Sequence, residues 1–313
     1  MLDVKRLQVL LKVVETGSVS AAADELFYTP SAVSQQLRKL EEEVGQPLLR
    51  RHSRGMVPTD AGHVLAGHAR TILRQMDAAA ADLASLAGLH GGSVSVGTFP
   101  TAGGSFLPLV ISRFRHEYPA VKLDVRSQRL EGLVDLLGRG EVGLCLLWEY
   151  AWNPLDPKDF DLTPVFDEPT VLVVGSEHRL ADRTHVAMAD LKSEQWIVRA
   201  DDHPVAEVLE RSCRAAGFTP RISFQANDYQ EAQAMVSVGL GIALAPFSAV
   251  VNHHPGVKVL SLGDEAPSRR VVLAQRHDRV RAPAEVAFQS LLMQVAEEWR
   301  RDLENRALSQ PSS

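Results

Sequence analysis

The first 90 residues carry apolar side chains at helical spacing, interrupted by one basic, glycine- and proline-containing segment. The pattern predicts helices over residues 4–16, 19–27, 30–43 and 60–87. Thr29 is placed to cap the third helix, and Pro30 occupies its first turn, where a missing N–H costs nothing. The segment after Gly45 is broken by Gly55 and Pro58 and predicts a short β-hairpin, or wing. Residues 1–59 are therefore expected to form one helical domain with a wing.

The fourth predicted helix has an apolar stripe with spacings of 4, 3, 4, 3, 4 and 3 residues. A repeat of about 3.5 residues over three heptads is typical of a coiled-coil seam. The stripe consists of Leu65, Ala69, Ile72, Met76, Ala79, Leu83 and Leu86. Since residues 59–88 offer no second element to cover it, residues 60–88 are expected to form a dimerisation helix. The alternative is an amphipathic helix that packs on its own domain.

Beyond the linker at residues 88–92, the pattern changes to alternating strands and helices. This alternation runs from residue 92 to residue 307 and predicts an α/β region with largely parallel sheets. About 220 residues are many for one sheet, so two lobes are expected. Lobe one is placed at about 92–163 and 266–307, and lobe two at about 164–265.

Two short helices joined by the turn 27–29 form a predicted helix-turn-helix. The outer face of the second helix is polar and basic, which suits the major groove of double-stranded DNA. Ser34 and Gln35 are suited to base edges, whereas Thr29 and Ser31 are suited to phosphate. Arg50, Arg51 and Arg54 follow in the wing, where guanidinium groups bind phosphates or enter the minor groove.

The segment GSVSAAADELFYTPSAVSQQLRKLEEEVGQPLLRRHSRGMVPTDAG resembles the winged helix-turn-helix of LysR-type transcriptional regulators. The later fragment GLGIALAP and the order of the predicted parts agree with that family. The resemblance implies DNA-binding residues at Pro30, Ser31, Ser34, Gln35, Arg51 and Arg54. Thr29 and Arg38, on the polar and basic side of the second helix, complete the predicted set. Pro30 stands where the family often has Gln, which removes one base-reading side chain. Arg51 has an alternative role as an ion-pair partner of Glu41, Glu42 or Glu43.

The α/β region resembles the two-lobed fold of periplasmic solute-binding proteins, which in this family serves as the effector sensor. The effector is expected between the lobes, where strand ends and helix N-termini converge. Candidate effector-binding residues are Thr98, Pro100, Thr101, Gln128, Arg199 and Phe247. Hydroxyl groups and arginine suit a small anionic effector, although Thr98 and Thr101 are equally suited to ordinary helix capping. Trp148 is expected either to wall the cleft or to lie in the core.

Charge first argues against this interpretation and then sharpens it. The chain has a formal net charge of −6, which is unlike a protein that is basic throughout. Residues 28–58, however, hold five basic and three acidic side chains. So small a positive excess predicts weak binding by one chain and favours a dimer or tetramer, because oligomerisation multiplies the phosphate contacts.

Other function classes find little support in the sequence. No hydrolase, P-loop or dinucleotide motif occurs in its required context, so no catalytic residue and no cofactor is expected. His253 and His254 are adjacent, which suits a solvated loop better than a metal site, and no metal is expected. Cys145 and Cys213 are predicted to be inert packing residues. No signal peptide or membrane span is apparent, so a cytoplasmic protein without membrane contact is expected.

The leading hypothesis is a ligand-responsive, DNA-binding transcriptional regulator that acts as a homo-oligomer. One alternative is a solute-binding protein without a regulatory role, which would need export. Another is an α/β enzyme that carries an N-terminal interaction domain.

Overall fold

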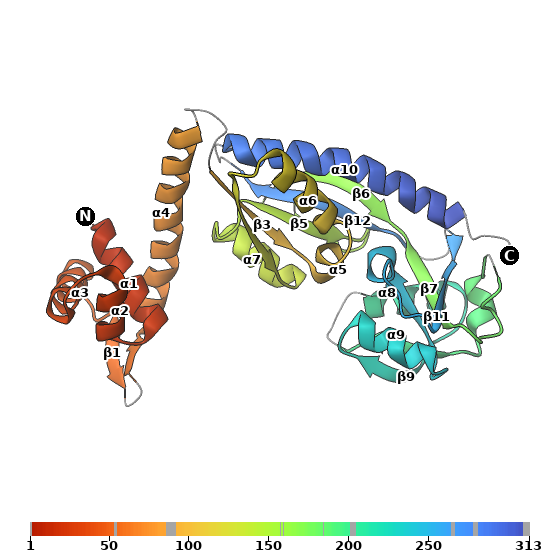
Figure 1. Ribbon diagram of the computed structural model, residues 1–313. Coiled ribbons are helices and arrows are strands. Elements are labelled where there is room, and N and C mark those ends of the chain that lie inside the picture. The colour runs from red at the N-terminus through yellow and green to blue at the C-terminus, as the bar shows by residue number, and fades with distance from the viewer. Residues whose placement is uncertain are drawn as a thin grey trace.

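The computed structural model describes residues 2–52, 55–85, 92–156, 158, 160–183, 185–200, 205–263, 267–277 and 281–308. A small helical domain stands at one end of the chain and a two-lobed α/β domain at the other, with a long helix beside the first (Figure 1). The order of these parts agrees with the expectation from the sequence.

The N-terminal domain consists of three helices, a wing and the start of the long helix. Its elements are α1 (Val4–Thr16), α2 (Val19–Leu26), α3 (Pro30–Val44), β1 (Leu49–His52), β2 (Gly55–Pro58) and α4 (Asp60–Ser85). The apolar faces of α1 and α3 meet in one core that includes Leu10, Val13, Val33 and Leu40. The hydrophobic periodicity therefore predicted these helices to within one or two residues.

Two glycines fix the wing against the rest of this domain. A Cβ at Gly55 would lie 2.5 Å from the carbonyl oxygen of Gly17, and a Cβ at Gly62 would lie 2.0 Å from that of Leu48. Both distances are too short for any other residue. The close approach at Gly55 also permits the hydrogen bond from Met56 N to Gly17 O, at 2.8 Å.

Helix α4 packs on α1, which corrects one argument made from the sequence. Ala69 is fully buried in the core of the N-terminal domain, and Leu65 packs against that core. These two positions are covered by their own chain, so Ala69 is not available for a dimer seam. Ile72 and Met76, in contrast, are 37% and 52% exposed. Ala79 is exposed, whereas the side chain of Leu83 and all of Leu86 lie outside the described residues.

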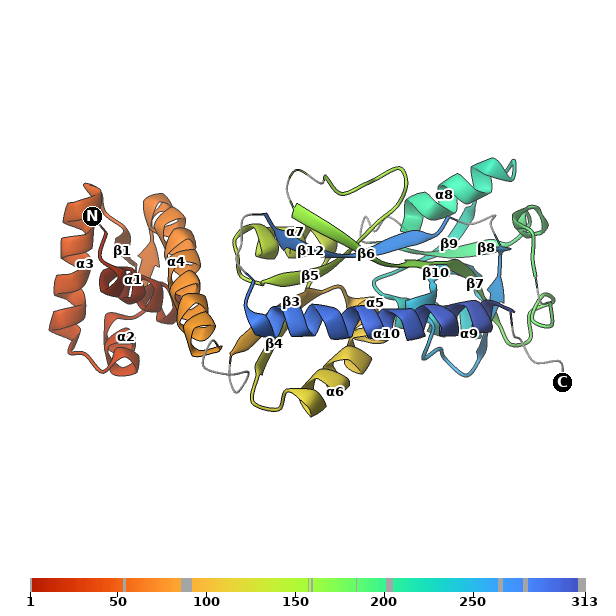
Figure 2. The same ribbon diagram turned by 90° about the horizontal axis from the view of Figure 1, so that it is seen from above.

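Lobe one is built on a five-stranded sheet with the order β4-β3-β5-β12-β6. Its strands are β3 (Ser93–Thr98), β4 (Lys122–Ser127), β5 (Leu144–Glu149), β6 (Phe160–Glu168) and β12 (Arg269–Arg276). Its helices are α5 (Pro100–Gly103), α6 (Leu107–Glu117), α7 (Leu130–Gly138) and α10 (Pro283–Leu308). Helix α10 lies along the α/β domain, as the view from above shows (Figure 2), and packs on α6, β3 and β6.

Lobe two is built on a second five-stranded sheet with the order β11-β7-β10-β8-β9. Its strands are β7 (Thr170–Gly175), β8 (Gln195–Arg199), β9 (Arg221–Ala226), β10 (Ile242–Pro246) and β11 (Val257–Ser261). Its helices are η1 (Met188–Leu191), α8 (Val205–Ala215), α9 (Tyr229–Ser237) and η2 (Phe247–Ala249). Alternate residues of β7 enter two different cores, so α8 and α9 cover opposite faces of this sheet.

Both sheets are mixed, which corrects the expectation of largely parallel sheets. β12 pairs antiparallel with β5 and β6, and β7 pairs antiparallel with β10 and β11. The cause is the double crossover. The chain leaves lobe one through β6, passes Pro169 and enters lobe two as β7, and it returns between β11 and β12. The lobe boundary expected at residues 163–164 therefore falls inside β6.

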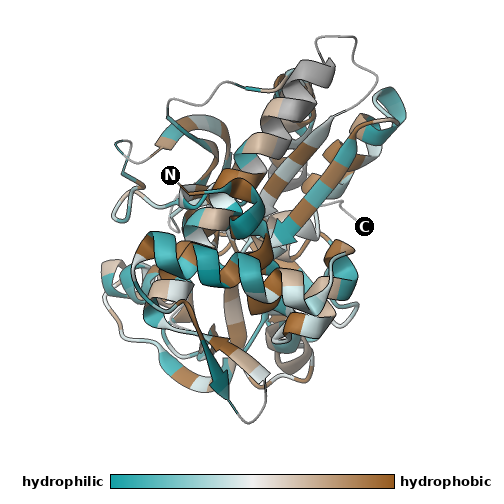
Figure 3. Ribbon diagram, turned by 90° about the vertical axis from the view of Figure 1, so that its left-hand side faces the viewer, coloured by the Kyte–Doolittle hydropathy of each residue, from teal (hydrophilic) through white to brown (hydrophobic). Residues whose placement is uncertain are grey.

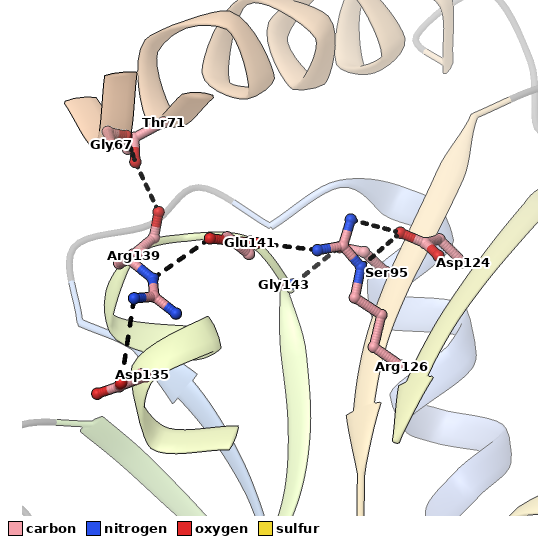
Figure 4. A network of polar contacts seen from close by, with 9 residues as sticks. All are labelled: Gly67, Thr71, Ser95, Asp124, Arg126, Asp135, Arg139, Glu141 and Gly143. Atoms are coloured by element: carbon pink, nitrogen blue, oxygen red, sulfur yellow. Dashed lines mark hydrogen bonds and ion pairs between the residues drawn. The ribbon is translucent and has the colours of Figure 1, made fainter. Parts of the chain in front are cut away.

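Helix α4 also touches lobe one, through a chain of polar contacts (Figure 4). The hydroxyl of Thr71 donates to the carbonyl oxygen of Arg139 at 2.7 Å. The Arg139 side chain lies 3.3 Å from Glu141, and Glu141 accepts from Arg126 at 2.9 Å. Arg126 also pairs with Asp124, on the same edge strand, at 3.2 Å. This network joins the helix that carries the DNA-binding domain to β4 of lobe one.

Candidate DNA interface and effector cleft

The helix-turn-helix is held in shape by side-chain caps at both of its helices. Ser18 accepts a hydrogen bond from Ala21 N at 3.3 Å, and Thr29 accepts one from Ala32 N at 3.2 Å. Between the helices, Phe27 adopts φ 57°, and it is the one non-glycine residue with positive φ in the part of the chain that the structure describes. The Thr29 and Ser31 hydroxyls lie 3.0 Å apart at the start of α3.

The predicted DNA-facing residues share one side of α3. Thr29, Pro30, Ser31, Gln35 and Arg38 are exposed and Ser34 is half-buried, whereas the opposite side is buried. Viewed from the DNA-binding end, the helices show hydrophilic positions alternating with hydrophobic ones (Figure 3). A polar face at helical spacing is what a helix needs to read the major groove.

A groove of about 870 Å³ separates α3 from the wing. Ser34 and Arg38 line it from α3, Ser18 and Ser20 from the start of α2, and Arg51 from the wing. The structure thus brings together predicted residues from two separate segments. Arg54 lies outside the described residues.

The alternative role for Arg51 was an ion pair with Glu41, Glu42 or Glu43, and among the described residues none of the three forms one with it. Glu41 accepts hydrogen bonds from Leu48 N and Leu49 N, and Glu43 pairs with Arg6. Neither of these carboxylates pairs with Arg51 among the described residues. The Arg51 guanidinium is exposed beside the groove.

The predicted effector-binding residues come from loops at the strand ends, and several meet between the lobes. Thr98 ends β3 and is buried, and its carbonyl oxygen accepts from Gln128 N at 3.1 Å. Helix α5, with Pro100 and Thr101, contacts η2, which begins at Phe247 in lobe two. The Pro100 and Gln128 side chains are exposed, while Thr101 and Phe247 are half-buried.

Arg199 lies deeper in lobe two, at the end of β8. Its guanidinium carbon stands 5.0 Å from the centre of the Tyr229 ring, an arrangement typical of a cation–π contact. Burial raises the pKa of Tyr229, so its hydroxyl stays protonated at neutral pH.

A charged pair that the sequence did not reveal is buried where the two lobes meet. Arg269 begins β12, Glu168 ends β6, and the two are paired in register across the sheet. Arg269 Nε donates to Glu168 Oε2 at 2.6 Å, and the side chains are only 2% and 1% exposed. Burial lowers the pKa of Arg269, but the charge and hydrogen bond of Glu168, together with Tyr150 and Tyr229, outweigh it and keep that pKa above its usual value.

Arg269 also contacts residues of both lobes. Its Nη2 donates to the Thr101 hydroxyl at 2.8 Å and to the Ser248 hydroxyl at 3.0 Å, and Ser248 N donates to Glu168. The guanidinium carbon lies 4.8 Å from the Phe99 ring centre and 5.6 Å from that of Trp148. Trp148 therefore both walls this cluster and belongs to the core.

Comparison with known proteins identifies both domains. Residues 4–63 match the model of the bacterial regulatory helix-turn-helix proteins of the lysR family, and residues 87–297, more than half of the chain, match the LysR substrate binding domain. The chain belongs to the LysR family of bacterial transcriptional regulators. It is accordingly a DNA-binding regulator that responds to a ligand.

Two curated relatives illustrate the range of the family. A hydrogen peroxide-inducible genes activator of Dickeya chrysanthemi is 30% identical over 278 residues, which cover 88% of this chain and 90% of the relative. The transcriptional dual regulator GltC of Bacillus subtilis is 30% identical over 298 residues, which cover 94% and 97%.

Solved structures of family members share the fold along nearly the whole chain. Full-length CbnR in complex with its target DNA aligns with a TM-score of 0.71 at 21% identity, covering 94% of this chain and 100% of CbnR. A cysteine variant of full-length OxyR from Pseudomonas aeruginosa aligns with a TM-score of 0.70 at 22% identity, covering 95% of each chain.

The described residues contain neither a membrane-spanning helix nor a cluster of metal-ligating side chains. Among the described residues, no helix is both long and apolar enough to cross a lipid bilayer. Nor do three His, Cys, Asp or Glu side chains gather as a metal site would require in that part of the chain.

Proposed function

We propose that this LysR-family regulator reads DNA with α3 and grips phosphates with the wing, as a homo-oligomer controlled by a small molecule between its lobes. The single observation that carries the DNA-binding part is the continuous surface formed by the exposed side of α3, the groove and Arg51. Ser34 and Gln35 face base edges, while Arg38 and Arg51 neutralise phosphates. A bacterial regulator of this kind meets its DNA in the cytoplasm, so we expect the protein to act there, as a regulator and not as an enzyme.

Replacement of Arg51 by alanine tests the DNA interface. Because Arg51 contacts the backbone, Arg51→Ala should weaken binding to all sequences rather than relax specificity. The slope of log affinity against log salt should fall by about one unit for each subunit bound. A mobility-shift titration of DNA from upstream of its own gene, at two salt concentrations, measures both effects.

Arg115→Ala is the matched control, because Arg115 is exposed on α6 of lobe one, outside the proposed DNA interface. If Arg51→Ala bound DNA with unchanged affinity and salt slope, the proposed role of the wing would be wrong. If the unaltered chain bound no DNA, the whole proposed interface would fail.

Self-association through the second half of α4 is the proposed route to a dimer or tetramer. Ile72, Met76 and Ala79 remain exposed after the N-terminal domain has covered Leu65 and Ala69. Exposed apolar side chains at coiled-coil spacing are stabilised by burial against a second copy of the same helix. Such a dimer would present two recognition helices to a pseudo-palindromic site.

The proposed effector is a small molecule with an oxyanion, bound beside Thr98, Thr101, Arg199 and Phe247. The hydroxyl groups of Thr98 and Thr101 and the guanidinium of Arg199 are groups that can donate hydrogen bonds to an oxyanion. Several relatives are named hydrogen peroxide-inducible genes activators, but the cysteines of this chain do not suit a peroxide-sensing role. Both thiols are buried, and burial raises the pKa of Cys213 to about 12 and that of Cys145 further still. A sensing thiol needs the opposite shift.

A further inference from the structure

We infer that Arg269 is a positioning residue that couples the effector-binding hydroxyl of Thr101 to the angle between the two lobes. This inference rests on the effector site proposed above and names the group that transmits its state. Arg269 belongs to lobe one, yet its Nη2 is shared between Thr101 of lobe one and Ser248 of lobe two.

The ion pair between Glu168 and Arg269 lies where the chain crosses between the lobes, so a change there can alter how the lobes are oriented. Glu168 immediately precedes Pro169, where the chain first passes between the lobes, and Arg269 is the first residue of the returning strand. Phe247 N donates to Pro169 O at 3.1 Å, and the Thr170 hydroxyl donates to Pro267 O at 2.6 Å. Lobe two therefore meets both connecting strands at the point where Ser248 is held.

Ser248 forms two hydrogen bonds with the ion pair, one as an acceptor and one as a donor. Its hydroxyl accepts from Arg269, and its backbone N–H donates to Glu168. Hydrogen bonds to charged groups are stronger than neutral ones, and in a buried site they hold a preferred geometry. The two lobes are thus joined through one residue on each side of the ion pair, Thr101 and Ser248.

The same geometry explains how a ligand would be sensed. Thr101 uses its oxygen to accept from Arg269, and its hydroxyl proton is a donor for a ligand oxyanion. A ligand that draws Thr101 toward itself changes the Thr101–Arg269 bond. Since the other bond of the same Nη2 holds Ser248, lobe two responds without touching the ligand at that point.

Hydrogen–deuterium exchange of the full-length protein tests this coupling without a known ligand. Ser248→Ala, in lobe two, should speed exchange of the amides of residues 98–103, in lobe one, by about tenfold, as expected for loss of a hydrogen bond to a charged group. Thr101→Val should speed exchange of residues 246–250 in the same way. The double variant should show little more than the larger single effect, because both hydroxyls act through one Nη2.

Two further variants separate coupling from simple packing. Ser237→Ala removes a hydroxyl whose bond to Ala234 O, at 2.8 Å, stays within α9, and it should leave residues 98–103 unchanged. Ser248→Thr retains the hydroxyl and should restore slow exchange. The inference is overturned if each substitution affects only its own lobe, or if the two effects add. Binding of DNA by the same variants, measured separately, reports on the proposed function and not on this coupling.

Discussion

At the scale of single residues, the two cysteines show how burial decides chemistry. Cys213 has a pKa of about 12, so at pH 8 only about one thiol in ten thousand is ionised. We expect both thiols to resist a disulfide reagent such as DTNB in the native protein and to react rapidly in urea. A raised pKa keeps the thiol in its protonated, unreactive form until the pH approaches that pKa. Rapid labelling of one thiol at pH 7 would contradict this and revive peroxide sensing.

The residues of the candidate sites differ in how far sequence alone could place them. Thr29 and Thr98 sit at helix starts and strand ends, where local spacing reveals them. Arg269 and Glu168 are 101 positions apart in the chain, and nothing local to either residue predicts that they pair. Only the double crossover of the fold brings β6 and β12 into register. The hydrophobic periodicity of the sequence therefore could not predict this buried ion pair.

At the scale of elements, the sequence pattern does not predict the strand β6, for an identifiable reason. It is an edge strand with polar residues at several positions and a proline, Pro164, near its middle. Pro164 lies opposite Val272, next to a shift in register. Proline is tolerated in edge strands and at irregularities, but it argues against a strand when only the sequence is known.

Helix α4, in contrast, was predicted correctly from the sequence, but what its apolar stripe contacts was predicted only in part. Its 3.5-residue repeat correctly predicted a long helix with one apolar stripe. The stripe has two environments. Its first turns pack on α1, whereas Ile72 and Met76 further along are exposed. Periodicity gives the face of a helix but not the identity of what covers it.

Two glycines of α4 provide a prediction about this element. Gly62→Ala would place a Cβ 2.0 Å from the Leu48 carbonyl oxygen, and such overpacking should cost about 1–3 kcal/mol of stability. Gly67, one and a half turns later, has nothing within 4 Å of its ideal Cβ. Gly67→Ala should therefore stabilise the helix by about 1 kcal/mol. Urea denaturation followed by circular dichroism measures both, and equal effects of the two substitutions would contradict the packing at Gly62.

At the scale of the whole molecule, the charge distribution and the long helix point to the same conclusion. A chain with a net charge of −6 carries its positive excess in a small domain at one end. One such domain makes few phosphate contacts, so affinity depends on joining two of them. The network from Thr71 to Asp124 then ties each DNA-binding domain to lobe one, which places changes between the lobes within reach of the DNA (Figure 4).

Self-association through α4 can be tested by substitutions on and off its apolar stripe. Ile72→Asp and Met76→Asp introduce a charge at exposed seam positions, where two helices of a dimer would bury it against a like charge. Light scattering after size exclusion should show the mass falling toward the 34.2 kDa of a single chain. Val64 is 63% exposed on the same helix but lies off the seam, so Val64→Asp should leave the mass unchanged. An unaltered mass in the seam variants would show that the dimer contact lies elsewhere. Dissociation together with weaker DNA binding would show that a single chain binds DNA more weakly than the oligomer does.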